Sequence, residues 1–317
     1  MSNTYNLNSS DVNLGSKSKI GCHFSNGFKK NKNNKTFTNK DKDGIKLGIL
    51  IILIIVSIIY KKYKISVLIA LLTSNFICKD VVRPIYLSSY IISIFVSNPP
   101  YLNIEKYFPQ YIDFEKPSNF RRIKKEVTEY ILKNSNAFFD TKDTFDAKTN
   151  YYIGGGDKVT GKKWKLSSIF VGNNFSKLAE QKLPFLVSLL KKNKNIVSCA
   201  ISILPAKKAI PIHVGYYKGI LRYQIAIKVP KDRNNVFICV NGEKYSWTEG
   251  KGVLFDDIYP HKVYNNSNEE RIVLYMDVKR KLNNVFLDKL NNFTINMLTN
   301  SNLARAEIKK TEYQVEI

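Results

Sequence analysis

The chain has 317 residues, 44% of them hydrophobic and 12% aromatic, which is enough to bury a substantial core and excludes a chain that is disordered throughout. Its formal net charge of +24 would suit nucleic acid or an anionic membrane surface. Lysine is accompanied by abundant asparagine and isoleucine along the whole chain, which indicates a general compositional bias. Nucleic acid is therefore not the expected partner.

The N-terminal part combines a polar tail with a strongly apolar run. Residues 1–44 are rich in Asn, Ser, Lys and Gly, so we expect a disordered basic tail. Residues 47–60 are uninterrupted apolar sequence, and they predict a transmembrane anchor at 45–63. Such a run rises only about 21 Å, so Tyr60, Tyr63 and the flanking lysines would have to extend it into the membrane interface.

A second apolar run follows at residues 65–78, within a membrane-associated segment at 64–100. It could span the membrane, re-enter it or lie in its interface. A pair of buried core helices is the alternative for both runs. We expect a single-pass membrane protein, whose orientation stays open because lysines flank the first run on both sides.

Residues 101–195 predict a supporting region of helices and loops. Helical spacing of apolar residues indicates a helix over 113–134, through Phe114, Phe120, Ile123, Val127 and Ile131. A second helix is expected over 175–192, interrupted at Pro184.

The periodicity changes to two after residue 193. Short β-rich runs separated by Pro, Gly, Asn and Asp fill residues 196–280 and predict an antiparallel sandwich or barrel with flanking helices. Asn241-Gly242 is a strong signal for a tight hairpin. In the C-terminal region, 281–317, one helical stripe should cover the barrel: Leu282, Phe286, Leu290, Phe293 and Met297.

Two of the expected strands carry arginine on one face. In the strand over 219–229, Arg222 and Gln224 alternate with apolar residues that point to the opposite face. Arg271 begins another strand, on the same face as Asp277. Asp277 could form a salt bridge with Arg222 or Arg271, or lie beside the solvated edge of the sheet. A buried arginine requires an anionic ligand or an acidic partner, so these faces are candidates for a binding site.

The chain has only three histidines, and two of them lie beside these strands. His213 precedes the first strand, and His261 begins a strand ten residues before Arg271. In a double-stranded β-helix, histidines can bind a metal while an arginine from a neighbouring strand holds the carboxylate of a cosubstrate. Two capping or surface histidines with no shared site are the alternative.

The segments HVGYYKGILRYQIAIKVP and YSWTEGKGVLFDDIYPHKVYNNSNEERIVLYMDVKR resemble the aspartyl/asparaginyl β-hydroxylase family of iron(II)- and 2-oxoglutarate-dependent dioxygenases. The resemblance covers about residues 196–280, where the HxG, LRY, WxxGK, FDDxxxH and ERIVLxxDV motifs occur in order. The apolar run followed by NPPYLNIEKYFP, and the YSW strand, are similar to the membrane-bound lipid A hydroxylases of the same family.

The resemblance implies a double-stranded β-helix of the jelly-roll or cupin type that uses Fe(II), 2-oxoglutarate and O2. It implies that His213 and His261 bind iron and that Arg271 pairs with the distal carboxylate of 2-oxoglutarate. Ser202 and Arg222 fall where the family has further cosubstrate contacts.

Two positions depart from the family's pattern. Gly215 stands where many dioxygenases have an acidic third ligand, although the protein-hydroxylating members share this glycine. Gln224 replaces a histidine near the cosubstrate. Gln224, Asp256 and Asp257 are candidates to support the metal ligands indirectly, and a turn capped by paired aspartates is the alternative for Asp256 and Asp257.

The expected function is hydroxylation of an Asp or Asn side chain in a protein, or of a lipid acyl chain. Gly215 favours the protein substrate, whereas the membrane run and the YSW strand favour the lipid. The alternative is a non-catalytic, membrane-anchored β-helix protein that has lost the chemistry and binds a partner, which Gln224 motivates.

Overall fold

The computed structural model describes residues 82–140, 144–146, 151–153 and 164–313. Its α-helices are α3 (Val82–Phe95), α4 (Ile104–Tyr107), α5 (Ile112–Glu115), α6 (Pro117–Lys133), α7 (Lys177–Lys182), α8 (Pro184–Lys192), α9 (Val285–Thr299) and α10 (Asn302–Tyr313). Short 3-10 helices are η2 (Pro109–Tyr111), η3 (Ser135–Ala137) and η4 (Arg233–Asn235). The expected tail at 1–44, the anchor at 45–63 and the apolar run at 65–78 lie outside the described residues.

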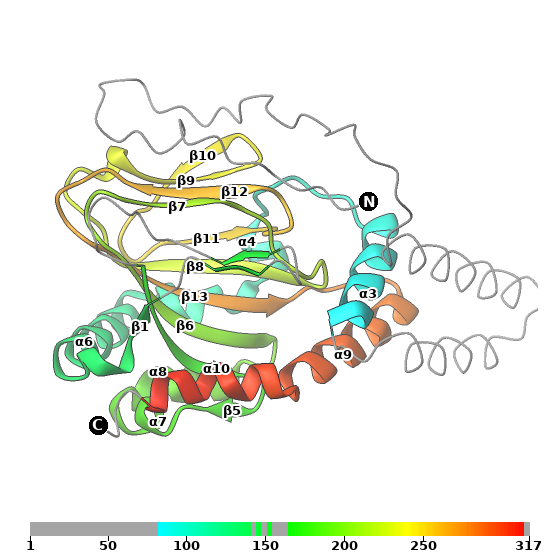
Figure 1. Cartoon of the computed structure of the whole chain (residues 1–317), viewed down its shortest axis with the longest axis horizontal. Coiled ribbons are helices and arrows are strands. Elements are labelled where there is room, and N and C mark those ends of the chain that lie inside the picture. The colour runs from blue at the N-terminus through cyan, green and yellow to red at the C-terminus, as the bar shows by residue number, and fades with distance from the viewer. Residues whose placement is uncertain (1–81, 141–143, 147–150, 154–163, 314–317) are drawn as a thin grey trace, which may run out of the picture.

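The strands before the barrel are β1 (Phe139–Asp140), β2 (Thr144–Asp146), β3 (Tyr151–Ile153), β4 (Lys165–Val171) and β5 (Asn174–Phe175). Those of the barrel are β6 (Ile196–Leu204), β7 (Lys208–His213), β8 (Ile220–Lys228), β9 (Val236–Val240), β10 (Glu243–Ser246), β11 (Gly252–Phe255), β12 (His261–Asn265) and β13 (Arg271–Lys279). Figure 1 shows them as two layers facing each other.

The two layers are antiparallel sheets, and consecutive strands of the chain belong to both of them. The larger sheet has the order β1-β4-β6-β13-β8-β11, and the smaller has the order β10-β9-β12-β7. From β6 to β13 the chain alternates between the sheets, except at the β9–β10 hairpin. This strand order is that of a double-stranded β-helix, so the expected mainly β architecture is confirmed.

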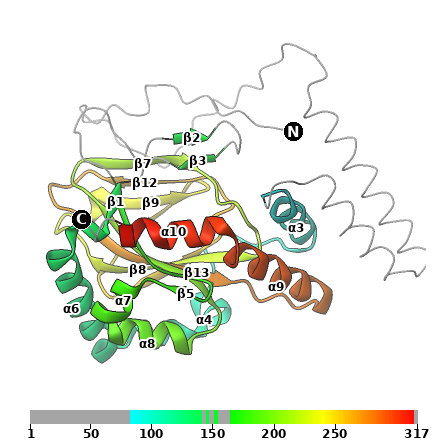
Figure 2. The same cartoon turned by 60° about the horizontal axis from the view of Figure 1, so that its bottom comes forward.

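Helices cover the outer face of the larger sheet. Leu221, Tyr223 and Ile225 of β8 are fully buried and pack with Ile123 and Val127 of α6. Figure 2 shows α6, α7 and α8 on this side of the sheets, with α10 lying across β4. The apolar outer faces of β8 and β13 thus pack against the supporting helices.

The opposite face of the larger sheet points into the space between the sheets. Ala226 of β8 and Val273 of β13 lie there, in a core with Ile238 of β9 and Val263 of β12. By strand alternation Arg222 and Gln224 share this inward face with Ala226. The polar residues that the sequence placed on one face therefore line the barrel interior.

Several local predictions are confirmed. The helix over 113–134 is present as α5 and α6, which are separated at Lys116 before Pro117, and Pro184 begins α8 after the short α7. Asn241 and Gly242 have φ of 49° and 87° between β9 and β10, as a tight hairpin of type I′ requires.

The region 101–195 is more than a helical and loop support. Within it, β4 pairs with β6 along nearly its whole length, and β1 pairs with β4, so both extend the larger sheet. The segment KLSSIFV of β4 has no clean alternation because five consecutive residues, 166–170, are buried. A strand covered on both faces lacks the period-two signal by which the other strands were found.

The C-terminal stripe was predicted only in part, because Leu282 is buried and Met297 packs against the same cluster, whereas two phenylalanines are exposed. On α9, Phe286 and Phe293 are 60% and 55% exposed, whereas Asn291 and Thr294 are at most 1% exposed. The helix therefore packs through a mixed face, in which Leu287 is buried beside these two polar residues, and turns part of the predicted stripe outward. Hydrogen bonds decide this orientation, since Asn291 Nδ2 donates to the carbonyls of Gly219 (2.9 Å) and Arg280 (3.2 Å).

No helix among the described residues is both long enough and apolar enough to span a bilayer.

Candidate metal centre

Two histidines face each other across neighbouring strands of the smaller sheet. His213 is the last residue of β7 and His261 is the first residue of β12, and the register places them directly opposite. Their ring centroids are 4.1 Å apart. The structure thus brings together two imidazoles that are far apart in sequence, as a shared metal site requires.

The hydrogen bonding of His261 leaves one ring nitrogen suited to a metal. Its Nδ1 lies 2.9 Å from the carbonyl oxygen of Tyr259. Because a carbonyl can only accept, Nδ1 carries the proton and Nε2 presents its lone pair. Burial lowers the pKa of His261 well below its usual range, and His213 lowers it further. The neutral imidazole that a metal ligand must be is therefore the stable form.

Arg271 is a buried arginine without an acidic partner. It is 1% exposed, and no carboxylate of the residues that the structure describes lies within ion-pairing distance of it. Burial lowers the pKa of its guanidinium to about 9. The contacts of Arg271 are weak: its Nη2 lies 3.5 Å from Ser202 Oγ, and its guanidinium lies 4.9 Å from the ring of Trp247.

Several buried polar atoms around the barrel interior have no hydrogen-bond partner within the part of the chain that the structure describes. They are Arg271 Nε, Trp247 Nε1, Gln224 Oε1 and Asp257 Oδ1. Leaving such atoms unpaired costs about 1–3 kcal/mol each, so native proteins seldom tolerate several together. A small anionic molecule beside Arg271 would satisfy both the charge and the donors, which fits a dicarboxylate cosubstrate.

Arg222 is held differently from Arg271. Its Nη2 donates to Asp257 Oδ2 at 3.0 Å, and its Nε lies 2.8 Å from Asp277 Oδ1. Burial alone would lower the pKa of Arg222, but Asp277 and Asp257 more than offset it and raise the pKa above the ordinary value. The charge of this predicted cosubstrate contact is thus already neutralised by two carboxylates, one of which the sequence had offered as its partner.

Asp257 occupies the space that a side chain at position 215 would need. A Cβ added to Gly215 would lie 2.3–2.7 Å from the three atoms of the Asp257 carboxyl group. The amide of Gly215 also donates to the backbone carbonyl of Asp257. The chain therefore lacks an acidic residue at 215 but places a buried carboxylate from the β11–β12 turn at the same point.

Replacing Gly215 with alanine should destabilise the protein by about 1–3 kcal/mol, since the new methyl group must displace a buried carboxylate from Arg222. Urea unfolding of the variant measures this loss. Glycine at 219 also has no room for a Cβ, and Gly250 has φ of 74°, so neither is a neutral control. Val214→Ala, beside the site and half-buried, is the matched control. Unchanged stability of Gly215→Ala would contradict this packing.

Burial raises the pKa of Asp257 to about 6, with Arg222 acting against the shift. Between pH 4 and 6 the folded protein binds this proton more tightly than the unfolded chain, so the contribution of Asp257 to stability falls as the pH rises. The metal-free parent should therefore lose about 2 kcal/mol of unfolding free energy relative to Asp257→Asn as the pH rises through this range. Urea titrations at pH 4 and 6.5 measure the difference, and a constant difference would contradict it.

Asp256 belongs to a different cluster. Its Oδ2 accepts from Lys218 Nζ at 2.6 Å and lies 2.7 Å from Arg280 Nη2, and all three side chains are buried. Arg280 and Lys218 also reach the side chain of Asn98, at 2.9 and 3.3 Å. Asp256 therefore connects the segment after α3 to the turns beside the barrel. The main-chain carbonyl of Tyr259, and not Asp256, orients His261.

Sequence reasoning missed three contributors to the site. Trp164 Nε1 donates to Ser202 Oγ at 2.8 Å, Trp247 stacks by Arg271, and Tyr259 fixes His261 through its main chain. A main-chain contact carries no sequence signal. Trp247 is fully buried, and its Nε1, which has no hydrogen-bond partner among the described residues, also faces the site.

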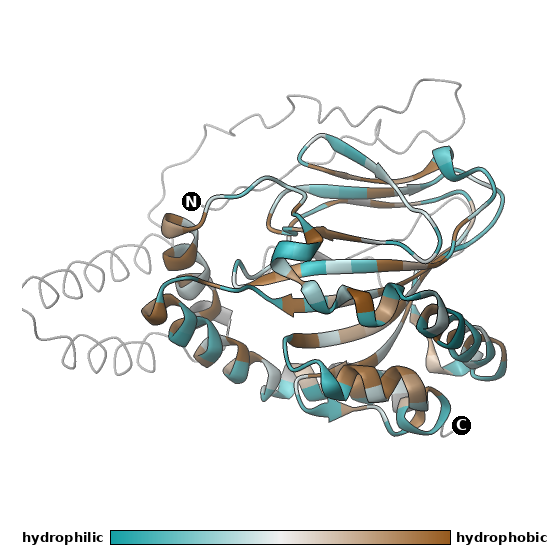
Figure 3. Cartoon of the chain, turned by 180° about the vertical axis from the view of Figure 1, so that it is seen from behind, coloured by the Kyte–Doolittle hydropathy of each residue, from teal (hydrophilic) through white to brown (hydrophobic). Residues whose placement is uncertain are grey.

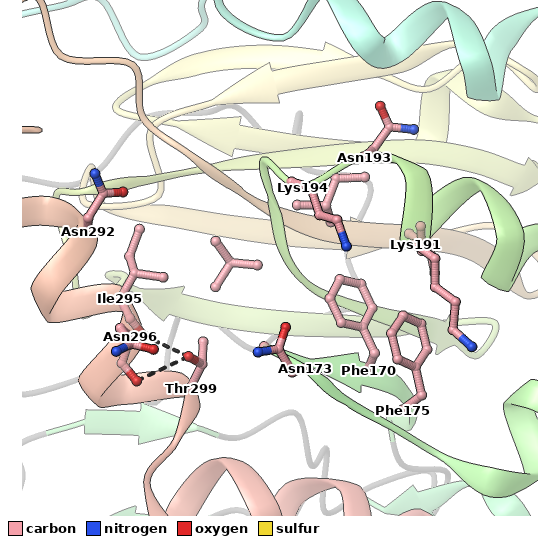
Figure 4. A pocket seen from close by; sticks show the side chains of 14 residues that line it. Phe170, Asn173, Phe175, Lys191, Asn193, Lys194, Asn292, Ile295, Asn296 and Thr299 are labelled. Atoms are coloured by element: carbon pink, nitrogen blue, oxygen red, sulfur yellow. Dashed lines mark hydrogen bonds between the residues drawn. The ribbon is translucent and has the colours of Figure 1, made fainter.

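In the part of the chain that the structure describes, no three His, Cys, Asp or Glu side chains form a metal cluster. The candidate centre stays the histidine pair, which rests on the facing rings described above. The pocket in Figure 4, about 210 Å³, lies elsewhere, between β4, the end of α8 and α9. It contains none of the expected site residues.

The chain is similar to several known proteins. The chain is 27% identical over 190 residues to an ornithine lipid ester-linked acyl 2-hydroxylase of Rhizobium tropici, and the match covers 59% of this chain and 63% of the relative. A prolyl-4-hydroxylase of Pseudomonas putida shows a partial structural likeness, with a TM-score of 0.34, 12% identity, and coverage of 51% of this chain and 88% of that one.

A 2-oxoglutarate and Fe(II) oxygenase of Burkholderia pseudomallei is similar over 40% of this chain and 70% of its own, with a TM-score of 0.31 and 14% identity. The family model described as aspartyl/asparaginyl beta-hydroxylase matches residues 117–281, which is more than half of the 317 residues. The match includes both histidines, Arg271 and the strands that carry them. The chain therefore belongs to the aspartyl/asparaginyl β-hydroxylase family.

Proposed function

We propose that this protein is an iron(II)- and 2-oxoglutarate-dependent hydroxylase that acts on a lipid acyl chain. The observation that carries the proposal is the combination of two facing imidazoles with a buried arginine that has no acidic partner among the described residues, on the walls of one barrel. A neutral imidazole pair suits a divalent metal, and an unpaired guanidinium suits a carboxylate.

The residues would divide the work as follows. His213 and His261 would hold the iron. Arg271 and Ser202 would hold the distal carboxylate of 2-oxoglutarate, and the Nε1–H of Trp247, which has no acceptor among the described residues, would donate to the same molecule. The bound iron and cosubstrate would supply the oxidation that converts a C–H group to C–OH, with succinate and CO2 as coproducts. The apolar walls of the barrel would exclude water from this reaction.

Asp257 would supply the carboxylate that Gly215 lacks. Its buried, unpaired Oδ1 could accept a hydrogen bond from a water beside the histidines, while Arg222 holds Oδ2. In this role Arg222 is a positioning residue for Asp257. Two protein ligands leave open positions for the cosubstrate and O2.

The lipid substrate is supported by two independent features. The relative from Rhizobium tropici hydroxylates an ester-linked acyl chain of ornithine lipid, as its name states. The apolar runs at 47–60 and 65–78 support attachment of this chain to a membrane, with an anchor at 45–63. The chain spans only 63% of that relative's length, so the same substrate is part of the proposal.

A second candidate substrate is an Asp or Asn side chain in a protein. Gly215 favours it, because the protein-hydroxylating members of the family share a glycine at this position. The two substrates present different chemistry at the mouth of the barrel: an extended apolar chain in one case and a polar peptide in the other.

The test measures succinate formed by the full-length chain in lipid nanodiscs with Fe(II), 2-oxoglutarate and O2. One arm adds ornithine lipid, and the other adds peptides with Asp or Asn. Succinate and a hydroxylated acyl chain in the first arm alone support the proposal. Product in the peptide arm alone supports the second candidate. Absence of succinate in both arms, together with absence of bound metal, would leave the non-catalytic binding protein.

A further inference from the structure

Large apolar side chains are exposed on two neighbouring helices at one end of the molecule. On α3 and α9 these residues, here called the α3–α9 face, are Tyr90, Ile94, Phe95, Val285, Phe286 and Phe293. Each is more than half exposed. Figure 3 shows hydrophobic segments of both helices at this edge, beyond the sheets. Apolar exposure of this extent marks a surface that contacts something else.

The orientation of α9 shows that this exposure is built into the fold. The helix buries Asn291 and Thr294 while two phenylalanines face outward. Thr294 Oγ1 donates to Ser88 Oγ of α3 at 2.8 Å, and Tyr217 OH donates to Asn291 Oδ1 at 2.8 Å. These buried hydrogen bonds fix the rotation of the helix, so the phenylalanines cannot turn inward.

The position of the α3–α9 face in the chain favours a bilayer as its occupant. The second apolar run ends at residue 78, and α3 begins at Val82. Four extended residues span at most about 14 Å, so α3 stays within that distance of wherever the apolar run ends. If the run is in the membrane, as proposed above, α3 begins close to the headgroups, where a helix with exposed apolar residues can lie in the interface.

The charge of the surroundings also favours an anionic membrane. Lys281 and Lys289 are exposed beside the apolar residues of α9. The acidic residue of the first turn, Asp288, is paired with Lys279 at 3.1 Å, so its charge is offset. Apolar residues flanked by lysines are typical of helices that lie in a membrane interface.

We propose that the α3–α9 face lies in the interface of an anionic bilayer and docks the barrel on the membrane. The proposal rests on the membrane attachment proposed above, but not on the hydroxylation chemistry. This second contact would have a function, because an anchor at 45–63 alone would not define the orientation of the barrel.

Docking would place the metal centre near the bilayer. The loop that leaves His213 is bonded to both helices: the Lys218 amide donates to Ser89 Oγ at 2.9 Å, and Gly219 accepts from Asn291. Figure 1 shows α3 and α9 side by side at the end of the sheets. The face that contacts lipid is therefore joined directly to the loop between His213 and Arg222.

The experiment places a tryptophan on the face and measures its contact with lipid. Full-length Phe95→Trp, Phe286→Trp and Phe293→Trp are each reconstituted in phosphatidylcholine and phosphatidylglycerol vesicles, with and without brominated acyl chains that quench tryptophan. Leu132→Trp is the matched control, because Leu132 is an exposed apolar residue on α6. Trp164 and Trp247 contribute the same background to every variant.

The expected result is loss of the added emission at 95, 286 and 293 and full retention at 132. Equal quenching at 286, 293 and 132 would overturn the docking. In that case, flotation of the protein with the vesicles would show that the chain is still attached to the membrane. A chain that does not float would overturn both the docking and the anchor. Succinate turnover is measured separately, so neither outcome is confused with failure of the hydroxylase proposal.

Discussion

Replacing Arg271 with methionine is expected to raise the KM for 2-oxoglutarate about a hundredfold. Removing one member of a buried charge pair costs about 2–5 kcal/mol, and each 1.4 kcal/mol is a factor of ten. The measurement is succinate formation as a function of 2-oxoglutarate concentration. Arg233→Met, which removes an exposed arginine from η4, is the control and should leave this KM unchanged.

The same variant distinguishes a cosubstrate site from a structural role. Because Arg271 has no carboxylate partner among the described residues, replacing it leaves no buried carboxylate without its counter-charge. The metal-free Arg271→Met protein should therefore resist urea at least as well as the parent. A loss of several kcal/mol in unfolding free energy with an unchanged KM would assign Arg271 to the fold and remove it from the site.

Replacing His261 with alanine should abolish metal binding and turnover. Loss of an outer partner of a metal ligand typically costs 10–100-fold in affinity, and loss of one of two protein ligands should exceed that. Lys262→Ala, the next residue of β12, is the control and should retain both. Turnover at the parental rate in His261→Ala would show that the reaction does not use this histidine.

The alternation of polar and apolar residues made the core of the site predictable. It placed Arg222 and Gln224 on one face of β8, and that face lines the barrel interior. The same reasoning placed Arg271 and Asp277 on one face of β13. Because the side-chain period of a strand is two, a correct strand assignment also fixes which side chains face inward.

The structure differs from the sequence-based predictions where contacts between residues distant in sequence determine the packing. The stripe on α9 has the spacing of a buried face, but hydrogen bonds from Asn291 and Thr294 to distant residues turn the helix the other way. The placement of Asp257 over Gly215 depends on the meeting of two turns that are 42 residues apart in sequence. Neither contact has a local signal, since both partners come from separate elements.

The pairing of Arg222 illustrates the same limit. The sequence showed an arginine that needed an anion and offered Asp277 as one partner, but it could not show that Asp257 would be the other. Arg271 and Arg222 share the inward face and yet have opposite surroundings. Only the structure separates the arginine that is free to bind a ligand from the one that holds a carboxylate in place.

Metal stoichiometry tests the central claim most directly. Mn(II), which replaces Fe(II) without oxidation, is titrated into the full-length chain with 2-oxoglutarate, and the free ion is counted by electron paramagnetic resonance. We predict one bound Mn(II) per chain for the parent and for Lys262→Ala, and none for His213→Ala and His261→Ala. Retention of one Mn(II) by both histidine variants, or none in the parent, would contradict a metal centre at this histidine pair.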